Sequence, residues 1–155
     1  MEHKTIIGTA NLVAPAMRML PAGPPHTCFG VARSMLPGVR TLSAATPLAP
    51  LALCLVAAHV LECTLKAYLS RGGSDKAVRA STVRHNIVAL WSMAHAQGLA
   101  VTLAPPDWVK TLSDLHNSPY HLRYSTGVYG IVKPAIQPMA AELESLVQTV
   151  GLAIA

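Results

Sequence analysis

The chain has 155 residues, of which 52% are hydrophobic and only 12% are charged, and its formal net charge is +5. This length fits one domain, and the high hydrophobicity with low charge excludes intrinsic disorder as the main state. The aromatic content of 5% argues against a stacking surface for single-stranded nucleic acid. With so few charges at the surface, we expect apolar surface to be covered by a second copy or by a partner.

The N-terminal third of the chain is interrupted by proline and glycine. A first helix is predicted over Thr5–Leu20 and a short second one over Cys28–Leu36. Residues 21–50 contain six prolines and three glycines, so they cannot form one continuous helix. We therefore interpret residues 1–47 as an irregular or partly helical segment that packs on a bundle formed by residues 48–155, within a single domain.

The remaining sequence shows apolar residues at helical spacing, separated by short glycine or proline turns. Ser81 or Thr82 is suited to cap the helix that starts at Val83, and Pro105-Pro106 precedes the one that starts at Asp107. Short connections place successive helices side by side. The prediction is an all-α, up-and-down bundle of four or five helices, with the best-defined helices over residues 48–70, 83–97, 107–116 and 134–154.

The segment Thr41–Leu61 carries no formal charge, which raises the question of a membrane span. Pro47, Pro50 and His59 interrupt it, so a helix at the centre of the bundle is the better interpretation, and we expect no membrane contact. The cysteines, which match no zinc-binding spacing, and the absence of a signal-peptide pattern at the N-terminus predict a cytoplasmic protein. These cysteines are Cys28, Cys54 and Cys63.

His59, Glu62 and Lys66 lie on one face of the predicted 48–70 helix. Polar groups on an apolar helix are costly unless they are paired. They indicate either a polar network that fixes helix packing or a polar pocket inside the bundle. A metal site would need a second set of carboxylate and histidine ligands, which the other helices do not offer at Glu-x-x-His spacing, so we expect neither a metal nor a cofactor.

A second group of polar residues surrounds the end of the predicted 107–116 helix. Arg123 suits a phosphate or a carboxylate, with Tyr124 or His85 as hydrogen-bond partners; the alternative is a structural pair with Glu62. His85 either lies at the surface, with Asn86 as a cap, or points back at the face of Glu62. The densest part of this group contains His116, Tyr120, His121, Arg123 and Tyr124.

Basic residues crowd the turn between the predicted 48–70 and 83–97 helices. They are opposed there by one acid, Asp75. A solvated turn is the simpler interpretation, and contact with nucleic-acid phosphates is the alternative. The residues concerned are Arg71, Lys76, Arg79 and Arg84.

Three segments resemble the HEPN family (higher eukaryotes and prokaryotes nucleotide-binding). They are the strings from Ala58 to Gly73, from His85 to Trp91, and from Leu122 to Tyr124, in that order. The resemblance covers roughly residues 48–150. It implies a helical bundle that forms a homodimer, a nucleotidyltransferase partner in many members, and ribonuclease activity in some.

Nucleolytic members of that family carry an arginine followed four to six residues later by a histidine, late in the bundle. Here no histidine follows Arg123, whereas Arg79 and His85 have such a spacing too early in the chain. The prediction is therefore a non-catalytic binding module for an anionic or nucleotide-like ligand, with a site formed by His59, Glu62, Lys66, His85, Arg123 and Tyr124. The alternatives are a ribonuclease toxin that uses Arg79 and His85, or Arg123 and His121, to cut RNA, and a structural partner of a nucleotidyltransferase.

Overall fold

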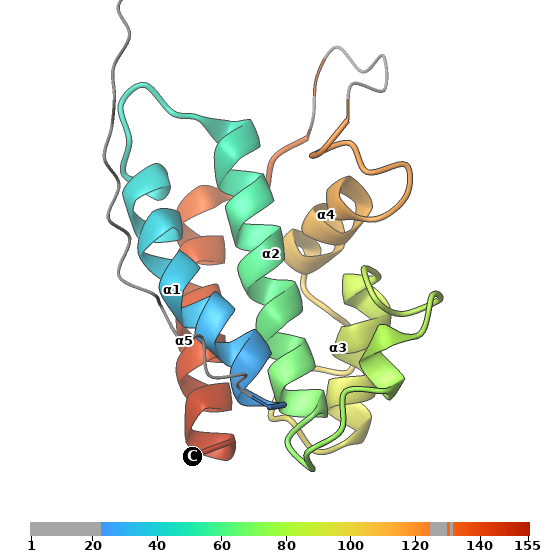
Figure 1. Cartoon of the computed structure of the whole chain (residues 1–155). Coiled ribbons are helices and arrows are strands. Elements are labelled where there is room, and N and C mark those ends of the chain that lie inside the picture. The colour runs from blue at the N-terminus through green and yellow to red at the C-terminus, as the bar shows by residue number, and fades with distance from the viewer. Residues whose placement is uncertain (1–22, 125–129, 131) are drawn as a thin grey trace, which may run out of the picture.

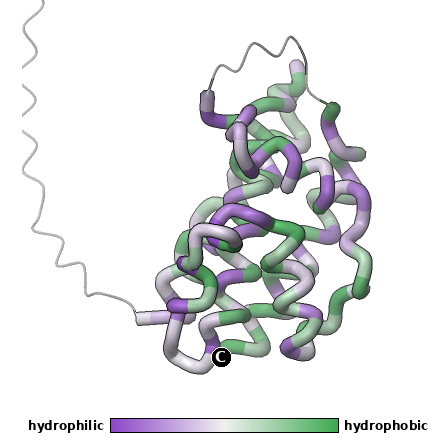
Figure 2. The backbone as a smooth tube through the Cα atoms, turned by 90° about the vertical axis from the view of Figure 1, so that its right-hand side faces the viewer, coloured by the Kyte–Doolittle hydropathy of each residue, from purple (hydrophilic) through white to green (hydrophobic). Residues whose placement is uncertain are grey.

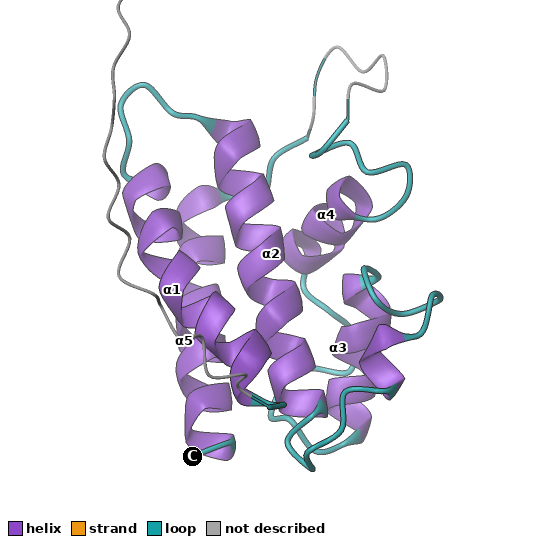
Figure 3. Ribbon diagram, viewed as in Figure 1, coloured by secondary structure: helices purple, strands orange, loops and turns teal. Residues whose placement is uncertain are grey.

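The computed structural model describes residues 23–124, 130 and 132–155. This part of the chain is all helical and contains no strand (Figures 1 and 3). The all-α prediction is confirmed. The elements are α1 (His26–Ser43), α2 (Pro50–Leu69), a 3-10 turn η1 (Ala77–Arg79), α3 (Ile87–Ala96), α4 (Asp107–His116) and α5 (Ile136–Ala153).

Helix α2 is the centre of the molecule and packs against α1, α3, α4 and α5. In Figure 1, α1 and α5 lie on one side of α2, and the shorter α3 and α4 lie on the other. The colour gradient shows that α1 runs antiparallel to α2, whereas α5 runs in the same direction as α2. Hydrophobic and hydrophilic residues alternate along the tube in Figure 2, as expected for helices with one buried side.

The sequence explains both ends of α2. Pro50 stands at the first helical position, where its missing N–H costs no hydrogen bond. At the other end the Ser70 N–H donates to Lys66 O at 3.0 Å, and Gly73 follows with a φ of 88°. The predicted 48–70 helix is therefore confirmed within two residues at each end.

Within the described residues, α2 is the one helix long and apolar enough to cross a membrane by length and composition. Its apolar window is 67% buried inside the molecule. Cys54 and Cys63 are both among its buried side chains. The helix therefore forms the core that the uncharged sequence predicted.

Helix α1 is longer than the predicted Cys28–Leu36 helix because it continues through Pro37. A proline inside a helix removes one backbone hydrogen bond, but Pro37 is exposed while Leu36 and Val39 are buried beside it. Packing of this buried face against α2 and α5 holds the helix together across the proline. The predicted Thr5–Leu20 helix lies outside the described residues.

The prediction for α3 is wrong at its start. The helix begins at Ile87 and not at Val83, and its cap is Asn86, whose Oδ1 accepts a hydrogen bond from the Ala89 N–H at 3.0 Å. Ser81 and Thr82 lie in a turn instead. His85 consequently lies just before the helix, next to the capping residue.

Helices α4 and α5 agree well with the sequence. The bounds of α4 are those predicted, and α5 is two residues shorter at its start and one at its end. The predicted apolar stripe of α5 is buried, and it includes Leu143, Leu146, Val147 and Val150. On α4 the buried face contains a histidine, His116, beside Leu112 and Leu115, and this histidine leads to the polar site.

Candidate functional site: a buried carboxylate beside a polar pocket

Glu62 lies at the centre of the molecule with 3% of its surface exposed. Its Oε1 accepts a hydrogen bond from Lys66 Nζ at 2.6 Å. Its Oε2 lies 2.5 Å from His116 Nε2 and 3.3 Å from His85 Nδ1. Three segments far apart in the sequence therefore converge on one carboxylate. Of the two alternatives for His85, the structure shows the one in which it points at Glu62, while Asn86 forms the cap.

The surroundings of Glu62 keep it charged. Burial alone would raise the pKa of this carboxyl group, but hydrogen bonds from His116 and Lys66, and the positive charge of Lys66, lower the pKa to about 2. A buried carboxylate is stable only when donors surround it. The network therefore keeps Glu62 ionised in the interior of the protein.

The geometry also assigns the hydrogen on His116, whose side chain is fully buried. Because a carboxylate only accepts, the Nε2 of His116 must carry the hydrogen that is donated to Glu62. Nδ1 has no hydrogen-bond partner among the described residues. A second N–H at that position would be buried and unpaired, so the geometry favours the tautomer with hydrogen on Nε2 alone.

Arg123 approaches this network without pairing with the carboxylate. Its Nη2 atom lies 3.4 Å from His116 Nε2, but both groups are donors, so the contact is not a hydrogen bond. The expected Arg123–Glu62 pair is not found among the contacts of the described residues. The guanidinium remains exposed at the edge of the network.

A small pocket of about 210 Å³ opens beside the network and is lined by His85, Tyr120, Arg123 and Tyr124. The Tyr120 ring makes edge-to-face contacts with the rings of His85, at 6.1 Å between centroids, and of Tyr124, at 6.2 Å. Two phenol groups, a guanidinium and an imidazole therefore surround the same space.

The loop after α4 holds the pocket in shape. Tyr120 has a φ of 63°, the one positive φ at a non-glycine residue in the described part of the chain. Backbone strain of this kind persists only where neighbouring contacts enforce it. Here Arg123 N–H and Tyr124 N–H both donate to Tyr120 O, at 2.9 and 3.1 Å, and Leu122 anchors the loop with 6% exposure.

The structure places the predicted site residues in a network around Glu62, in the adjacent pocket and, for His59, apart from both. Lys66 and His85 each bond Glu62, and Arg123 and Tyr124 line the adjacent pocket together with His85. His59 lies apart on α2: its Nε2 is 3.8 Å from Cys63 Sγ, and burial lowers the pKa of this imidazole.

Of the four residues in the predicted ribonuclease alternatives, two line the pocket and two lie outside it. Arg79 is exposed and pairs with Asp75 at 2.6 Å, and neither it nor His121 lines the pocket. Arg71 of the same basic turn stacks on Tyr68 and bonds Gln97. These contacts within the protein favour the solvated-turn interpretation of the basic segment.

Two residues of the candidate site were left out of the predicted one. His116 and Tyr120 were noticed as members of a polar cluster, but only the structure places them next to Glu62 and in the pocket. The signal for His116 was its position seven residues after Val109 and four after Leu112, on the buried face of α4. Tyr120 gave no such signal, because its place depends on the loop conformation.

The same residues could hold a metal ion by distance alone. One ligand atom from each of Glu62, His85 and His116 lies within 4.8 Å of the others. Three observations disfavour a cation: Lys66 already neutralises the carboxylate, Arg123 adds a positive charge 3.4 Å from His116 Nε2, and a metal there would move the hydrogen of His116 to its buried, unpartnered Nδ1. The donor set suits a hydrogen-bond network better.

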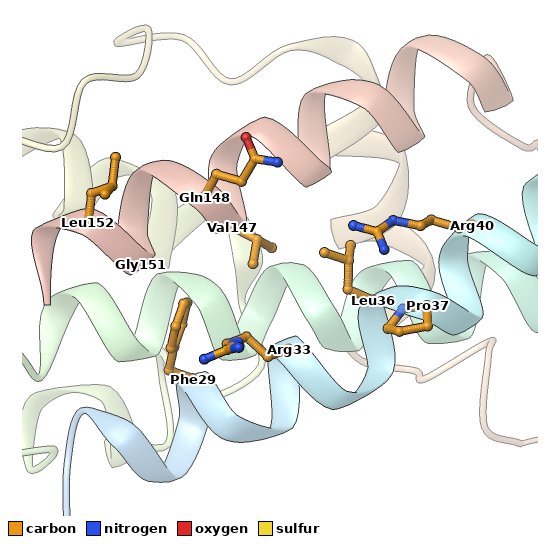
Figure 4. Close-up of a pocket in the computed structure, with 9 residues that line it drawn as sticks. All are labelled: Phe29, Arg33, Leu36, Pro37, Arg40, Val147, Gln148, Gly151 and Leu152. Atoms are coloured by element: carbon orange, nitrogen blue, oxygen red, sulfur yellow. The ribbon is translucent and has the colours of Figure 1, made fainter. Parts of the chain in front are cut away.

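A larger cavity of about 570 Å³ lies between α1 and α5 and contains none of the predicted site residues. Figure 4 shows the lining residues Phe29, Arg33 and Arg40 on α1, and Val147, which points toward α1, on α5. Arg40 is tied to Glu144 by an ion pair of 2.6 Å. This cavity therefore belongs to the contact between the two helices.

Compared with known protein families, with curated proteins and with solved structures, the chain shows no match.

Proposed function

We propose that the chain is a non-catalytic, HEPN-like binding module whose polar pocket takes the phosphate or carboxylate group of an anionic ligand. The observation that carries the proposal is the position of Arg123. Its guanidinium lines the pocket and has no carboxylate partner among the described residues. Arginine binds phosphate and carboxylate groups through paired N–H donors, so an oxyanion is the ligand that this position fits.

The charges behind the pocket also favour an anion. Both oxygens of Glu62 are occupied, one by Lys66 and the other by the two imidazoles. Lys66 and Arg123 bring two positive charges against the single negative charge of Glu62. What faces the pocket is therefore a donor surface with excess positive charge, and Glu62 acts as a positioning residue for His85.

The size of the pocket limits the part of the ligand that it takes. Pockets for drug-sized molecules have volumes of roughly 300–1,000 Å³, and this pocket has about 210 Å³. A single phosphate or carboxylate group fits that space, and the rest of a nucleotide-like ligand would extend outside. The phenol groups of Tyr120 and Tyr124 supply further donors at its rim.

The HEPN part of the proposal is supported by the origin of the side chains. Each of the three segments that resemble that family supplies one member of the cluster: Glu62 from the first, His85 from the second and Arg123 from the third. The non-catalytic part is supported by the positions of Arg79 and His121. Neither lines the pocket, which leaves His85 as the imidazole there, whereas RNA cleavage by side chains uses a separate acid and base.

The test is calorimetric titration of the protein with inorganic phosphate and with a nucleoside monophosphate. We expect saturable binding that weakens at least about tenfold, or about 1.4 kcal/mol, in Arg123→Gln. Arg79→Gln is the matched control, because it removes an exposed arginine outside the pocket and should bind as the wild type does. Absence of binding in the wild type, or equal loss in both variants, would overturn the proposal. RNA cleavage that requires Arg123 would replace it with the ribonuclease alternative.

We also propose, from the same family resemblance, that the chain forms a homodimer and has a nucleotidyltransferase partner. Leu48, just before α2, and Leu51 and Leu55 in its first turns are exposed by 47%, 51% and 36%. Exposed apolar side chains that lie together are typical of contact surfaces. Analytical ultracentrifugation of the wild type and of Leu51→Glu tests the dimer: a dimer that dissociates in the variant supports it, and a monomeric wild type rejects it.

A further inference from the structure

A second small pocket, of about 190 Å³, lies on α5 beside α3, α4 and the loop between them, and it shares no residue with the polar pocket above. It brings together two indole rings, one carboxylate and two hydroxyl groups. Its lining residues are Trp91, Ala100, Val101, Trp108, Glu142, Ser145, Leu146 and Thr149.

Both indole rings are fixed by their N–H groups. Trp91 Nε1 donates to Thr102 O at 2.8 Å, and Trp108 Nε1 donates to Glu142 Oε2 at 2.6 Å. Both side chains are more than nine-tenths buried, with 4% and 8% exposure. An indole has one donor and no acceptor. With that donor used, each ring offers the pocket only its apolar and π-electron surface.

Glu142 is the one charged residue that lines this pocket in the described part of the chain. Its Oε2 is held by Trp108, and no described residue bonds its Oε1. The charge is unusual for this protein, whose 12 basic residues outnumber its 7 acidic ones. The pocket is thus negative where the molecule as a whole is positive, which favours a cationic occupant.

The lining identifies the kind of cation. A metal ion requires several oxygen, nitrogen or sulfur ligands, whereas this lining offers one carboxylate and two hydroxyl groups beside indole rings and aliphatic side chains. An alkylated ammonium ion suits it, because such a cation interacts with aromatic rings and with a carboxylate and needs no hydrogen bonds. We propose that this pocket binds a small alkylated ammonium group.

Tryptophan fluorescence provides a direct test, because the chain has two tryptophans and both line the pocket. The probe is tetramethylammonium chloride, with sodium chloride at equal ionic strength as the blank and tert-butanol as a neutral molecule of similar shape. We expect a saturable change in emission with tetramethylammonium and a dissociation constant at least about tenfold higher for tert-butanol.

Two glutamate variants make the test specific. Glu142→Gln keeps an acceptor for Trp108 but removes the charge, and it should weaken tetramethylammonium binding at least about tenfold. Glu144→Gln is the control on the same helix, where the carboxylate pairs with Arg40 instead, and it should leave binding unchanged. No saturable change in the wild type, equal affinity of Glu142→Gln, or equal affinity for tert-butanol would each overturn the proposal.

Discussion

Glu62 and His116 are separated by 54 positions in the chain, yet Oε2 of the first lies 2.5 Å from Nε2 of the second in the interior. The contact joins α2 to α4, and α2 is the helix on which the other four pack. A buried carboxylate and its donor therefore link the core to the loop that carries Arg123. This link makes stability and the polar site depend on the same residues.

The first prediction concerns the pH dependence of stability. The pKa of Glu62 is about 2 in the folded protein, whereas the ordinary pKa of a glutamate side chain, taken for the unfolded chain, is 4.5. Because the folded value is the lower one, its contribution is fully present above about pH 4.5 and is lost as the pH falls through about 2. A shift of this size corresponds to about 3 kcal/mol.

Urea unfolding of the wild type and of Glu62→Gln between pH 2 and pH 6 measures this contribution. The difference in unfolding free energy between the two proteins should be largest at pH 6 and should shrink as the pH falls toward 2. Glu144→Gln, which removes an acid from an exposed ion pair, should show no such convergence. A difference that stays constant over this range would contradict the assignment of charge to Glu62.

The second prediction concerns the donor on His116. His116→Gln places an amide N–H near the position of Nε2, whereas His116→Leu leaves the buried carboxylate with one donor fewer. We expect the leucine variant to be less stable than the glutamine variant by about 1–3 kcal/mol, because an unsatisfied buried group keeps its full desolvation cost. Thermal unfolding at neutral pH measures which variant is the more stable. A leucine variant that is as stable as the glutamine variant, or more stable, would contradict the hydrogen bond between His116 and Glu62.

The third prediction separates an anion site from a metal site. After treatment with a chelator, inorganic phosphate should raise the melting temperature of the protein, because a ligand that binds only the folded state stabilises it. Zinc chloride should leave the melting temperature unchanged, since Lys66 and Arg123 surround the three potential ligands with positive charge. A zinc-dependent increase that disappears in His116→Gln would instead establish a metal centre.

The helical fold could be predicted from sequence because its signals are local. Apolar spacing together with Pro50 and Gly73 defines α2, and the prolines before Asp107 define the start of α4. One error arose where packing outweighs local preference. Helix α1 continues through Pro37 because its other face is buried. The error at α3 is a choice between local signals, since the helix starts directly after Asn86, whose side chain caps it, and not after Ser81 or Thr82.

The candidate site was only partly predictable for a related reason. Glu62 and Lys66 share one helix, so their pairing follows from helical geometry. Their contacts with His85 and His116 depend on how three segments pack, which spacing along the chain does not report. Tyr120 depends on a positive φ in an irregular loop, for which a tyrosine gives no sequence signal.

The fourth prediction concerns the cap of α3, which directly follows His85 in the chain. Asn86→Ala removes the Oδ1 that accepts from the Ala89 N–H, and we expect a loss of about 1 kcal/mol in unfolding free energy. Ser92→Ala is the control, since this exposed serine lies inside the same helix and bonds only Val88 O. Equal effects of the two substitutions in chemical denaturation would show that Asn86 does not act as a cap.

The fifth prediction concerns the close contact of α1 with α5 in Figure 4. A Cβ atom added at Gly151 would lie 2.9 Å from Phe29 Cζ, so the phenyl ring would have to move. Gly151→Ala should therefore stabilise the wild type less than the helix preference of alanine alone would, because the ring has to shift into the adjoining cavity. In a Phe29→Leu background the obstacle is gone, and the same substitution should be neutral or stabilising. The coupling in this double-mutant cycle should reach about 1 kcal/mol, and equal effects in both backgrounds would contradict the contact.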